Sequence, residues 1–153
     1  MKRSVRVCVG ASSGGHLAQM LRVSAGWKAY PTFYVTTSQV AVPSLQRRGT
    51  VYVIAEAGRD RVLSTLRAVV QCFRILARER PDVVISSGSG SGCVLCLIGR
   101  LLGARVVWMD SIANVRRLSL SGRLIRPFAD ICLSQWPKVA RRYRRVEYLG
   151  RVL

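Results

Sequence analysis

Apolar positions along the chain fall into short runs that alternate with longer amphipathic stretches. The short runs are rich in β-branched and aromatic residues, as buried strands are, whereas the longer stretches repeat apolar residues every three or four positions, as helices do. We expect strands at residues 5–9, 32–36, 51–55, 82–86, 105–109 and 130–134, and a strand-like piece at 146–149. This alternation predicts an α/β fold: a single Rossmann-like domain over residues 1–153, with a doubly wound parallel sheet of about six to seven strands.

Helical periodicity is strongest between residues 60 and 80. One apolar stripe is predicted there, formed by Val62, Leu66, Val69, Val70, Phe73, Leu76 and Ala77. Another face carries Arg67, Arg74 and Arg78. The pattern fits a helix that packs its stripe on the core and exposes a solvated polar face, and the basic face also suits anionic lipid headgroups.

Two glycine-rich loops each follow a predicted strand and precede a predicted helix: GASSGGH at residues 10–16 and SSGSGSG at residues 86–92. In a parallel sheet both loops lie at the carboxyl ends of their strands and face one crevice. Glycine lets backbone N–H groups approach an anionic ligand, and a helix N-terminus adds positive charge. We therefore expect acceptor or phosphate contacts from Gly14, Gly15, Ser87, Gly88, Ser89 and Gly90.

The excess of basic residues limits the classes of binding partner that we expect. Lys and Arg total 25 against 7 Asp and Glu, a formal charge of +18, and 22 of the 25 are arginine. Guanidinium groups bind phosphate bidentately, so the partner is a nucleic acid, an anionic membrane or a pyrophosphate-bearing substrate. The first loop has neither the dinucleotide nor the P-loop spacing, and no acid follows strand 32–36 to bind a ribose, which disfavours an NAD(P)-binding protein. A basic nucleic-acid-binding module stays as the alternative, although no such motif is present and the arginines are dispersed.

The cysteines and the apolar runs indicate the compartment. Five cysteines, an odd number, lie in apolar stretches, and no apolar run approaches the ~20 residues that cross a bilayer. Cys93 and Cys96 form a CxxC pair that we interpret as small core residues. We expect a cytoplasmic protein without a signal peptide or anchor. No metal site is implied, because no carboxylate pair has ligand spacing, and no cofactor is expected.

Candidate chemistry centres on His16, the only histidine, at the start of a predicted helix. A helix N-terminus favours the neutral imidazole that a general base needs. Asp110, which follows strand 105–109, is the alternative base. Beside it, Ser111 is a candidate ligand contact, and Arg116 and Arg117 are candidates for neutralising a pyrophosphate.

Seven motifs occur together in order: GASSGGHLAQML, SSGSGSG, the Asp110–Ser111 pair, LSLSGRL at 118–124, AD at 129–130, QWP at 135–137 and YLGRV at 148–152. With them the chain resembles, over nearly its whole length, the Alg-fourteen/PssD-like family. Members of that family are N-terminal, acceptor-binding halves of split GT-B glycosyltransferases. The family more often has Glu-Ser where this chain has Asp110 and Ser111, and its eukaryotic members begin with a transmembrane anchor, so a short, peripherally bound member fits better.

The resemblance implies a glycosyltransferase subunit of hexosyl or N-acetylglucosaminyl type, inactive alone, in polysaccharide or lipid-linked oligosaccharide biosynthesis. It would bind a polyprenyl-linked acceptor at the inner face of the cell membrane. A catalytic GT-B C-terminal-type partner would hold the UDP-sugar donor. We expect the partner to cover the crevice and the C-terminal tail, at Tyr148, Leu149, Val152 and Leu153.

Overall fold

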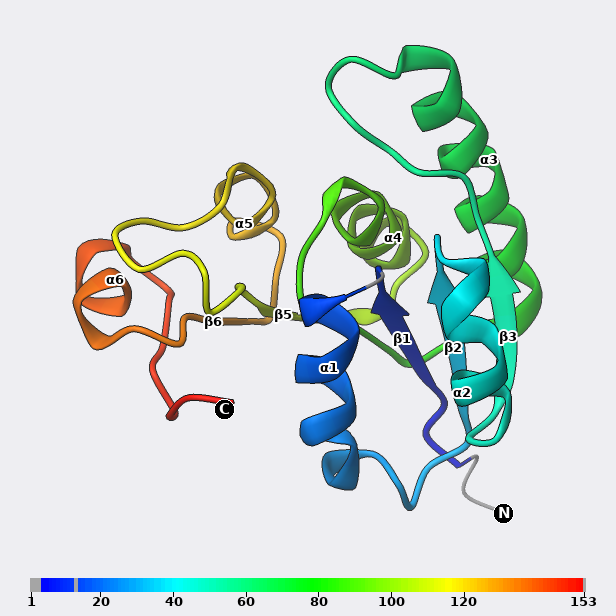
Figure 1. Cartoon of the computed structure of the whole chain (residues 1–153), viewed down its shortest axis with the longest axis horizontal. Helices are drawn as coiled ribbons and strands as arrows, with labels where there is room; N and C mark the ends of the chain where they lie inside the picture. The colour runs from blue at the N-terminus through cyan, green and yellow to red at the C-terminus, as the bar shows by residue number, and fades with distance from the viewer. Residues whose placement is uncertain (1–3, 13, 153) are drawn as a thin grey trace.

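The computed structural model of the chain describes residues 4–12 and 14–152. Six parallel strands form one sheet in the order β3-β2-β1-β4-β5-β6 (Figure 1). The strands are β1 Val7–Ala11, β2 Thr32–Thr36, β3 Thr50–Val53, β4 Val83–Ser86, β5 Arg105–Met109 and β6 Ile131–Leu133. The predicted doubly wound α/β fold is thus confirmed. The strand order reverses between β1 and β4, and at such a reversal the loops leaving the two strands diverge and open a crevice at the carboxyl edge.

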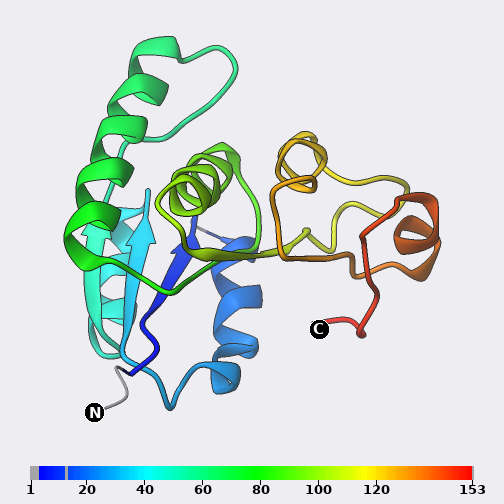
Figure 2. The ribbon, with the colours of Figure 1, turned by 180° about the vertical axis from the view of Figure 1, so that it is seen from behind.

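The helices cover both faces of the sheet. They are α1 Gly15–Arg22, α2 Val42–Gln46, α3 Val62–Glu79, α4 Gly90–Leu101, α5 Leu120–Ile125 and α6 Pro137–Arg142, with 3-10 turns η1 Ser24–Gly26 and η2 Gln39–Ala41. Figures 1 and 2, seen from opposite sides, show α1 and α2 on one face and α3 and α4 on the other. Helices α2 and α6 were not among the predicted helices. Each has a proline in its first turn, where the missing N–H costs no helical hydrogen bond.

Each face of the sheet has its own core, because successive side chains of a strand point to opposite faces. In β1, Val9 packs on the side of α1 and α2, with Met20, whereas Cys8 packs on the side of α3 and α4, with Leu95. All five cysteines are buried in this second core. Burial raises the pKa of Cys93 to about 11 and the pKa of Cys72 to about 12. The cysteines are therefore core thiols, as expected for the CxxC pair.

The strand-like piece predicted at 146–149 does not become a seventh strand. Glu147 makes an isolated parallel bridge to Leu133 in β6, and Tyr148 and Leu149 beyond it are exposed. The edge strand β6 has only three residues, so a further strand has few backbone groups with which to pair. Gly150 then turns the chain with a φ of 117°. Six strands form the sheet.

The apolar stripe of α3 is not the face that meets the core. Exposed side chains include Val62, Leu66, Val69, Val70 and Phe73 of the predicted stripe, together with Leu63. The buried residues of α3 are Ala68, Cys72 and Leu76. Two of these three side chains are small, so α3 packs closely along α4, and this contact turns most of the larger apolar residues outward. The prediction of a core-facing stripe was therefore wrong, except at Leu76.

Candidate functional site

The two glycine-rich loops meet at the crevice between β1 and β4. Gly88 has a φ of 138°, which L side chains rarely adopt, and a Cβ there would lie 2.5 Å from Cε1 of His16. Ser89 follows as the N-cap of α4, and its side chain accepts a hydrogen bond from the Gly92 N–H at 3.1 Å. The absence of a side chain at Gly88 therefore makes room for the imidazole ring of His16.

Two hydrogen bonds fix His16 against the second loop. Its Nδ1 lies 3.0 Å from the Ser87 carbonyl oxygen, and the Ser87 hydroxyl donates to the His16 carbonyl oxygen at 3.0 Å. A carbonyl oxygen accepts hydrogen bonds and cannot donate them, so in this bond Nδ1 carries the proton. In the neutral ring Nε2 then has the lone pair, as a base requires.

A cleft of about 450 Å³ opens beside the imidazole. Its lining residues are His16, Gly88, Ser89, Asp110, Ser111, Ala113, Asn114, Arg117, Leu118, Ser119, Leu120, Ser121 and Arg123. Six predicted site residues thus come together: His16, Gly88, Ser89, Asp110, Ser111 and Arg117. Hydroxyl groups, one amide and two guanidinium groups suit a hydroxyl-rich ligand that carries phosphate.

The other predicted ligand residues do not line the cleft. Gly14 and Gly15 are exposed at the start of α1. Gly90 packs against the loop before α3, where a Cβ would lie 2.4 Å from the Ala57 carbonyl oxygen. Arg116 is exposed and does not line the cleft. Ser87 does not line it either, but its carbonyl oxygen forms a hydrogen bond with the imidazole of His16.

The Asp110 carboxylate is buried and already receives three hydrogen bonds. Oδ1 accepts from Trp108 Nε1 at 3.2 Å and from the Ser119 hydroxyl at 2.6 Å, and Oδ2 accepts from the Ser119 backbone N–H at 2.9 Å. Ser119 is the N-cap of α5 and accepts in turn from the Gly122 N–H. Asp110 therefore anchors α5, which brings Arg123 to the cleft, and this geometry favours an anchor over a base.

Asp110→Asn should destabilise the fold, because an amide offers one acceptor oxygen where the carboxylate offers two. At least one buried donor then faces an NH2 group, which costs about 1–3 kcal/mol. Urea unfolding measures the loss. Asp60→Asn, at an exposed carboxylate, is the matched control and should change stability by less than about 0.5 kcal/mol. Equal effects of the two substitutions would contradict the anchoring role.

Sequence reasoning did not assign Asn114, Ser119, Ser121 or Arg123 to the site, although all four line the cleft. The two serines belong to the LSLSG motif, one of the motifs that the chain shares with the family. That motif was the available signal, since its two serines follow closely on the basic pair Arg116 and Arg117.

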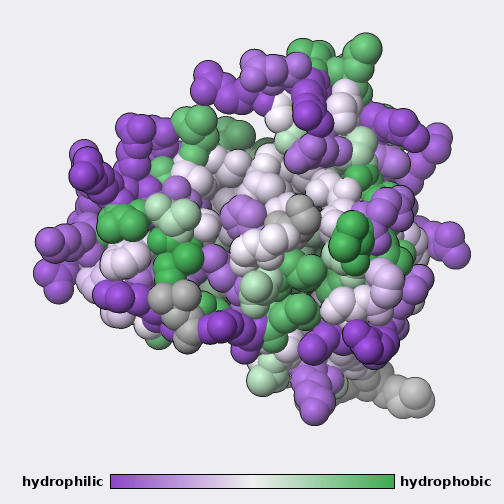
Figure 3. Space-filling model, in the orientation of Figure 1, coloured by the Kyte–Doolittle hydropathy of each residue, from purple (hydrophilic) through white to green (hydrophobic). Residues whose placement is uncertain are grey.

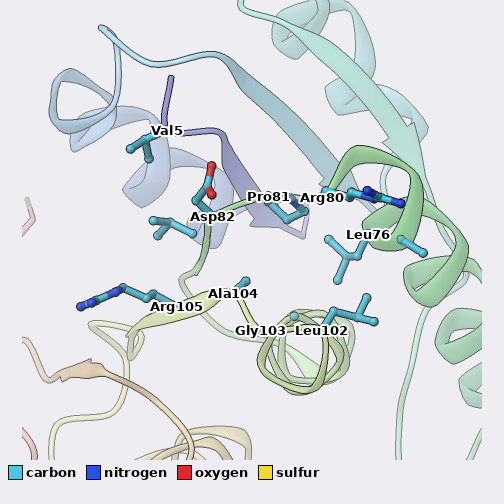
Figure 4. Close-up of a pocket in the computed structure, with 12 residues that line it drawn as sticks. Val5, Leu76, Arg80, Pro81, Asp82, Leu102, Gly103, Ala104 and Arg105 are labelled. Atoms are coloured by element: carbon cyan, nitrogen blue, oxygen red, sulfur yellow. The ribbon is translucent and has the colours of Figure 1, made fainter. Parts of the chain in front are cut away.

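A larger cavity, about 670 Å³, lies at the opposite, amino edge of the sheet (Figure 4). Leu76 of α3 and Leu102 just after α4 lie on one side of it, and Arg105 lies on the other. Both helices end at this cavity, and helix C-termini carry partial negative charge, which disfavours an anion. The smaller cleft at the carboxyl edge is therefore the candidate site.

In the C-terminal tail, Tyr148 and Leu149, two of the four residues predicted to contact a partner, are exposed. Val152 instead packs partly against the core on the α1 side, and Leu153 lies outside the described residues. Figures 1 and 2 agree that the tail runs from α6 back toward α1. The tail thus presents two large exposed apolar residues, Tyr148 and Leu149, between two anchored ends.

The outward face of α3 forms an apolar surface bordered by arginines. Exposed apolar side chains include Leu63, at 83% exposure, and Leu66, at 57%. Figure 3 shows apolar side chains among hydrophilic ones at the upper end of this helix. Among residues 4–12 and 14–152, no helix combines the length and the apolar character needed to cross a bilayer.

Comparison with known proteins identifies the family. Residues 53–152 match the family described as "Oligosaccharide biosynthesis protein Alg14 like". The UDP-N-acetylglucosamine transferase subunit ALG14 of Eremothecium gossypii is 35% identical over 97% of this chain and 79% of its own length. The human subunit of the same name is 28% identical over 99% of this chain and 85% of its own length.

Among solved structures, MurG of Acinetobacter baumannii superposes with a TM-score of 0.73 at 17% identity, over 88% of this chain and 43% of its own. The chain thus spans less than half of that structure, and at this identity the likeness is one of fold. The fold, the motifs and the matched residues agree, and the chain belongs to the Alg14-like family of oligosaccharide biosynthesis proteins.

Proposed function

We propose that this chain is the acceptor-binding subunit of a UDP-N-acetylglucosamine transferase. Its relatives bear the name of subunits of that enzyme. The observation that carries the proposal is the cleft at the strand-order reversal, which His16 lines together with polar and cationic side chains while its Nδ1 is bonded to the Ser87 carbonyl. The cleft would hold a lipid-linked, diphosphate-bearing acceptor, and a separate subunit would bring the nucleotide-sugar. Transfer from UDP-N-acetylglucosamine to such an acceptor, with and without the partner, tests it.

In this proposal His16 is the general base. The acceptor hydroxyl attacks the anomeric carbon of the donor sugar, the bond to UDP breaks, and Nε2 takes the hydroxyl proton. The imidazolium that results is stabilised by the Ser87 carbonyl, to which Nδ1 already donates. UDP leaves with the bonding electrons and is stabilised by the partner subunit, as the division of labour between two GT-B domains requires.

The arginines of the cleft would bind the acceptor diphosphate. Arg117 and Arg123 approach from the two ends of the segment that Asp110 anchors. A guanidinium group matches two phosphate oxygens at once and stays charged at all physiological pH values. Asn114 and Ser121 would then bind the hydroxyl groups of the acceptor sugar.

The outward face of α3 would hold the subunit peripherally on the inner leaflet. Around α3 the exposed apolar residues lie between the buried face and the basic face of Arg67, Arg74 and Arg78. A helix with this arrangement lies in the plane of a membrane, with apolar residues below the headgroups and cations at their level. Anionic lipid and acceptor diphosphate together also account for the net charge of +18 that suggested a nucleic acid.

Leu66→Glu combined with Phe73→Glu should abolish most binding to anionic vesicles. Both side chains are more than half exposed, so the fold should persist, while two carboxylates oppose both the apolar contact and the anionic surface. Arg67→Gln with Arg74→Gln should weaken binding as well, by about 1 kcal/mol for each charge. Sedimentation with vesicles of phosphatidylglycerol and phosphatidylcholine measures both effects.

The matched control is Val40→Glu, since Val40 is 90% exposed in η2, away from α3. It should bind vesicles as the unchanged chain does. If the α3 variants bind as well as this control, or if neutral vesicles bind equally well, membrane docking through α3 is wrong.

The partner subunit would dock on the exposed residues of the tail and close the crevice. Tyr148 and Leu149 offer apolar and aromatic contact area, which protein interfaces favour. Docking there would leave α3 open to the membrane, because the tail runs past α6 toward α1, on the far side of the molecule (Figure 1).

A further inference from the structure

Gln135 lies between the C-terminal tail and the cleft. It is 2% exposed, and all of its hydrogen-bonding partners come from distant segments. Its Nε2 donates to Gln19 Oε1 at 3.0 Å and to the Asp110 carbonyl oxygen at 3.1 Å, while its Oε1 accepts from the Val152 N–H at 3.0 Å. One buried amide therefore joins the tail, α1 and the end of β5.

Trp136 also connects the C-terminal tail to the segment after β5, through a different kind of contact. Its Nε1 donates to the Ile112 carbonyl oxygen at 2.7 Å, and the Arg151 guanidinium lies 4.4 Å from its ring centroid. Like Gln135, it holds the tail on one side and the segment after β5 on the other. Asp110 and Ser111 of that segment line the cleft.

Gln19 extends the bridge to the proposed base. It follows His16 by three positions on α1, so the two side chains lie on neighbouring turns of one helical face. Gln19 is itself buried, at 7% exposure. A buried amide pair with satisfied hydrogen bonds has few alternative geometries, because an unpaired donor or acceptor there is costly. Val152 and α1 are thus connected by two consecutive hydrogen bonds through Gln135.

We propose that Gln135 and Trp136 couple the C-terminal tail to the cleft, so that a partner docked on the tail sets the position of His16 and of residues 110–112. The proposal rests on the proposed function, in which the partner binds Tyr148 and Leu149. These two residues lie between Glu147, bonded to β6, and Val152, bonded to Gln135. A partner that pulls on them moves the Val152 N–H relative to Gln135. Gln135 is then a positioning residue.

The test uses His16 as a reporter, because a chain with one histidine gives one set of imidazole signals. The full chain, with ¹⁵N-labelled histidine, is compared with its Val152→Pro variant. Proline has no backbone N–H, so the hydrogen bond from residue 152 to Gln135 Oε1 is lost. Val152→Ala keeps that N–H and is the control. We expect displaced His16 signals and an affinity for inorganic pyrophosphate reduced at least about fivefold in Val152→Pro. Its melting temperature should fall by only a few degrees, because Gln135 Oε1 loses one buried hydrogen bond while the rest of the core is unchanged. Gln135→Leu should give the same displacement.

Unchanged His16 signals and pyrophosphate affinity in folded Val152→Pro would overturn the coupling, whatever the behaviour of Gln135→Leu. A failure of the proposed function is recognised separately. If the reconstituted pair transfers no sugar while Val152→Pro still displaces the His16 signals, the coupling stands and the assignment of the reaction is wrong.

Discussion

His16→Ala should lower sugar transfer by the reconstituted enzyme roughly a hundredfold or more, the usual loss when acid–base help is removed. The reason is geometric, since Nδ1 donates its proton to the Ser87 carbonyl in a hydrogen bond, so that Nε2 is the nitrogen left to act as a base for a ligand in the cleft that His16 lines. The fold should survive, because the substitution removes one hydrogen bond, worth about 1 kcal/mol, at a partly exposed position.

His16→Asn separates the base from the hydrogen bond. An asparagine amide is able to donate to the Ser87 carbonyl as Nδ1 does, but it has no basic nitrogen. The rate should therefore fall as far as in His16→Ala. Arg22→Ala, exposed at the other end of α1, is the control and should transfer normally. Transfer within a few-fold of normal by His16→Asn would reduce His16 to an orienting hydrogen-bond donor.

The sheet was readable from the sequence because its strands are short apolar runs separated by strong turn signals. Strands β2 and β5 have the predicted bounds, and β4 differs by one residue at its start. Pro81 stops α3 after Arg80, which closes the helix with a left-handed φ of 46°. The conjunction of His16 with the second loop was also predictable, because parallel strands bring their following loops to one edge.

The orientation of α3 was not readable, because periodicity locates an apolar face without saying what it meets. The face of small residues, Ala68 and Cys72, determines the packing against α4, and hydrophobicity alone ranks those residues below Leu66 or Phe73. For the same reason, periodicity alone does not distinguish a core helix from a helix that lies on a membrane surface.

The anchoring of Asp110 was hidden for a different reason. Its partner Ser119 lies nine residues away across an irregular loop, where no period links the two positions. A carboxylate just after a strand therefore looks like a catalytic group in the sequence. The bond from Val152 to Gln135 likewise joins segments that no pattern connects.

A second large effect is expected from the partner subunit. The 153-residue chain supplies one Rossmann-like sheet, with the cleft and the base that we propose for the acceptor, whereas a GT-B site is built between two such domains. We expect no transfer above background from the chain alone, and weak or absent binding of UDP-N-acetylglucosamine. Co-expression with a chain that carries a GT-B C-terminal domain should restore transfer. Deleting residues 149–153 should abolish complex formation and activity together.

The most direct measurement is the transfer of radiolabelled N-acetylglucosamine from its UDP donor to a polyprenyl-diphosphate-linked acceptor in anionic vesicles. It compares the purified chain, the purified partner and the two combined, at equal protein concentrations. The account predicts labelled lipid product from the combination and none above background from either protein alone. Robust transfer by the 153-residue chain without its partner would contradict it.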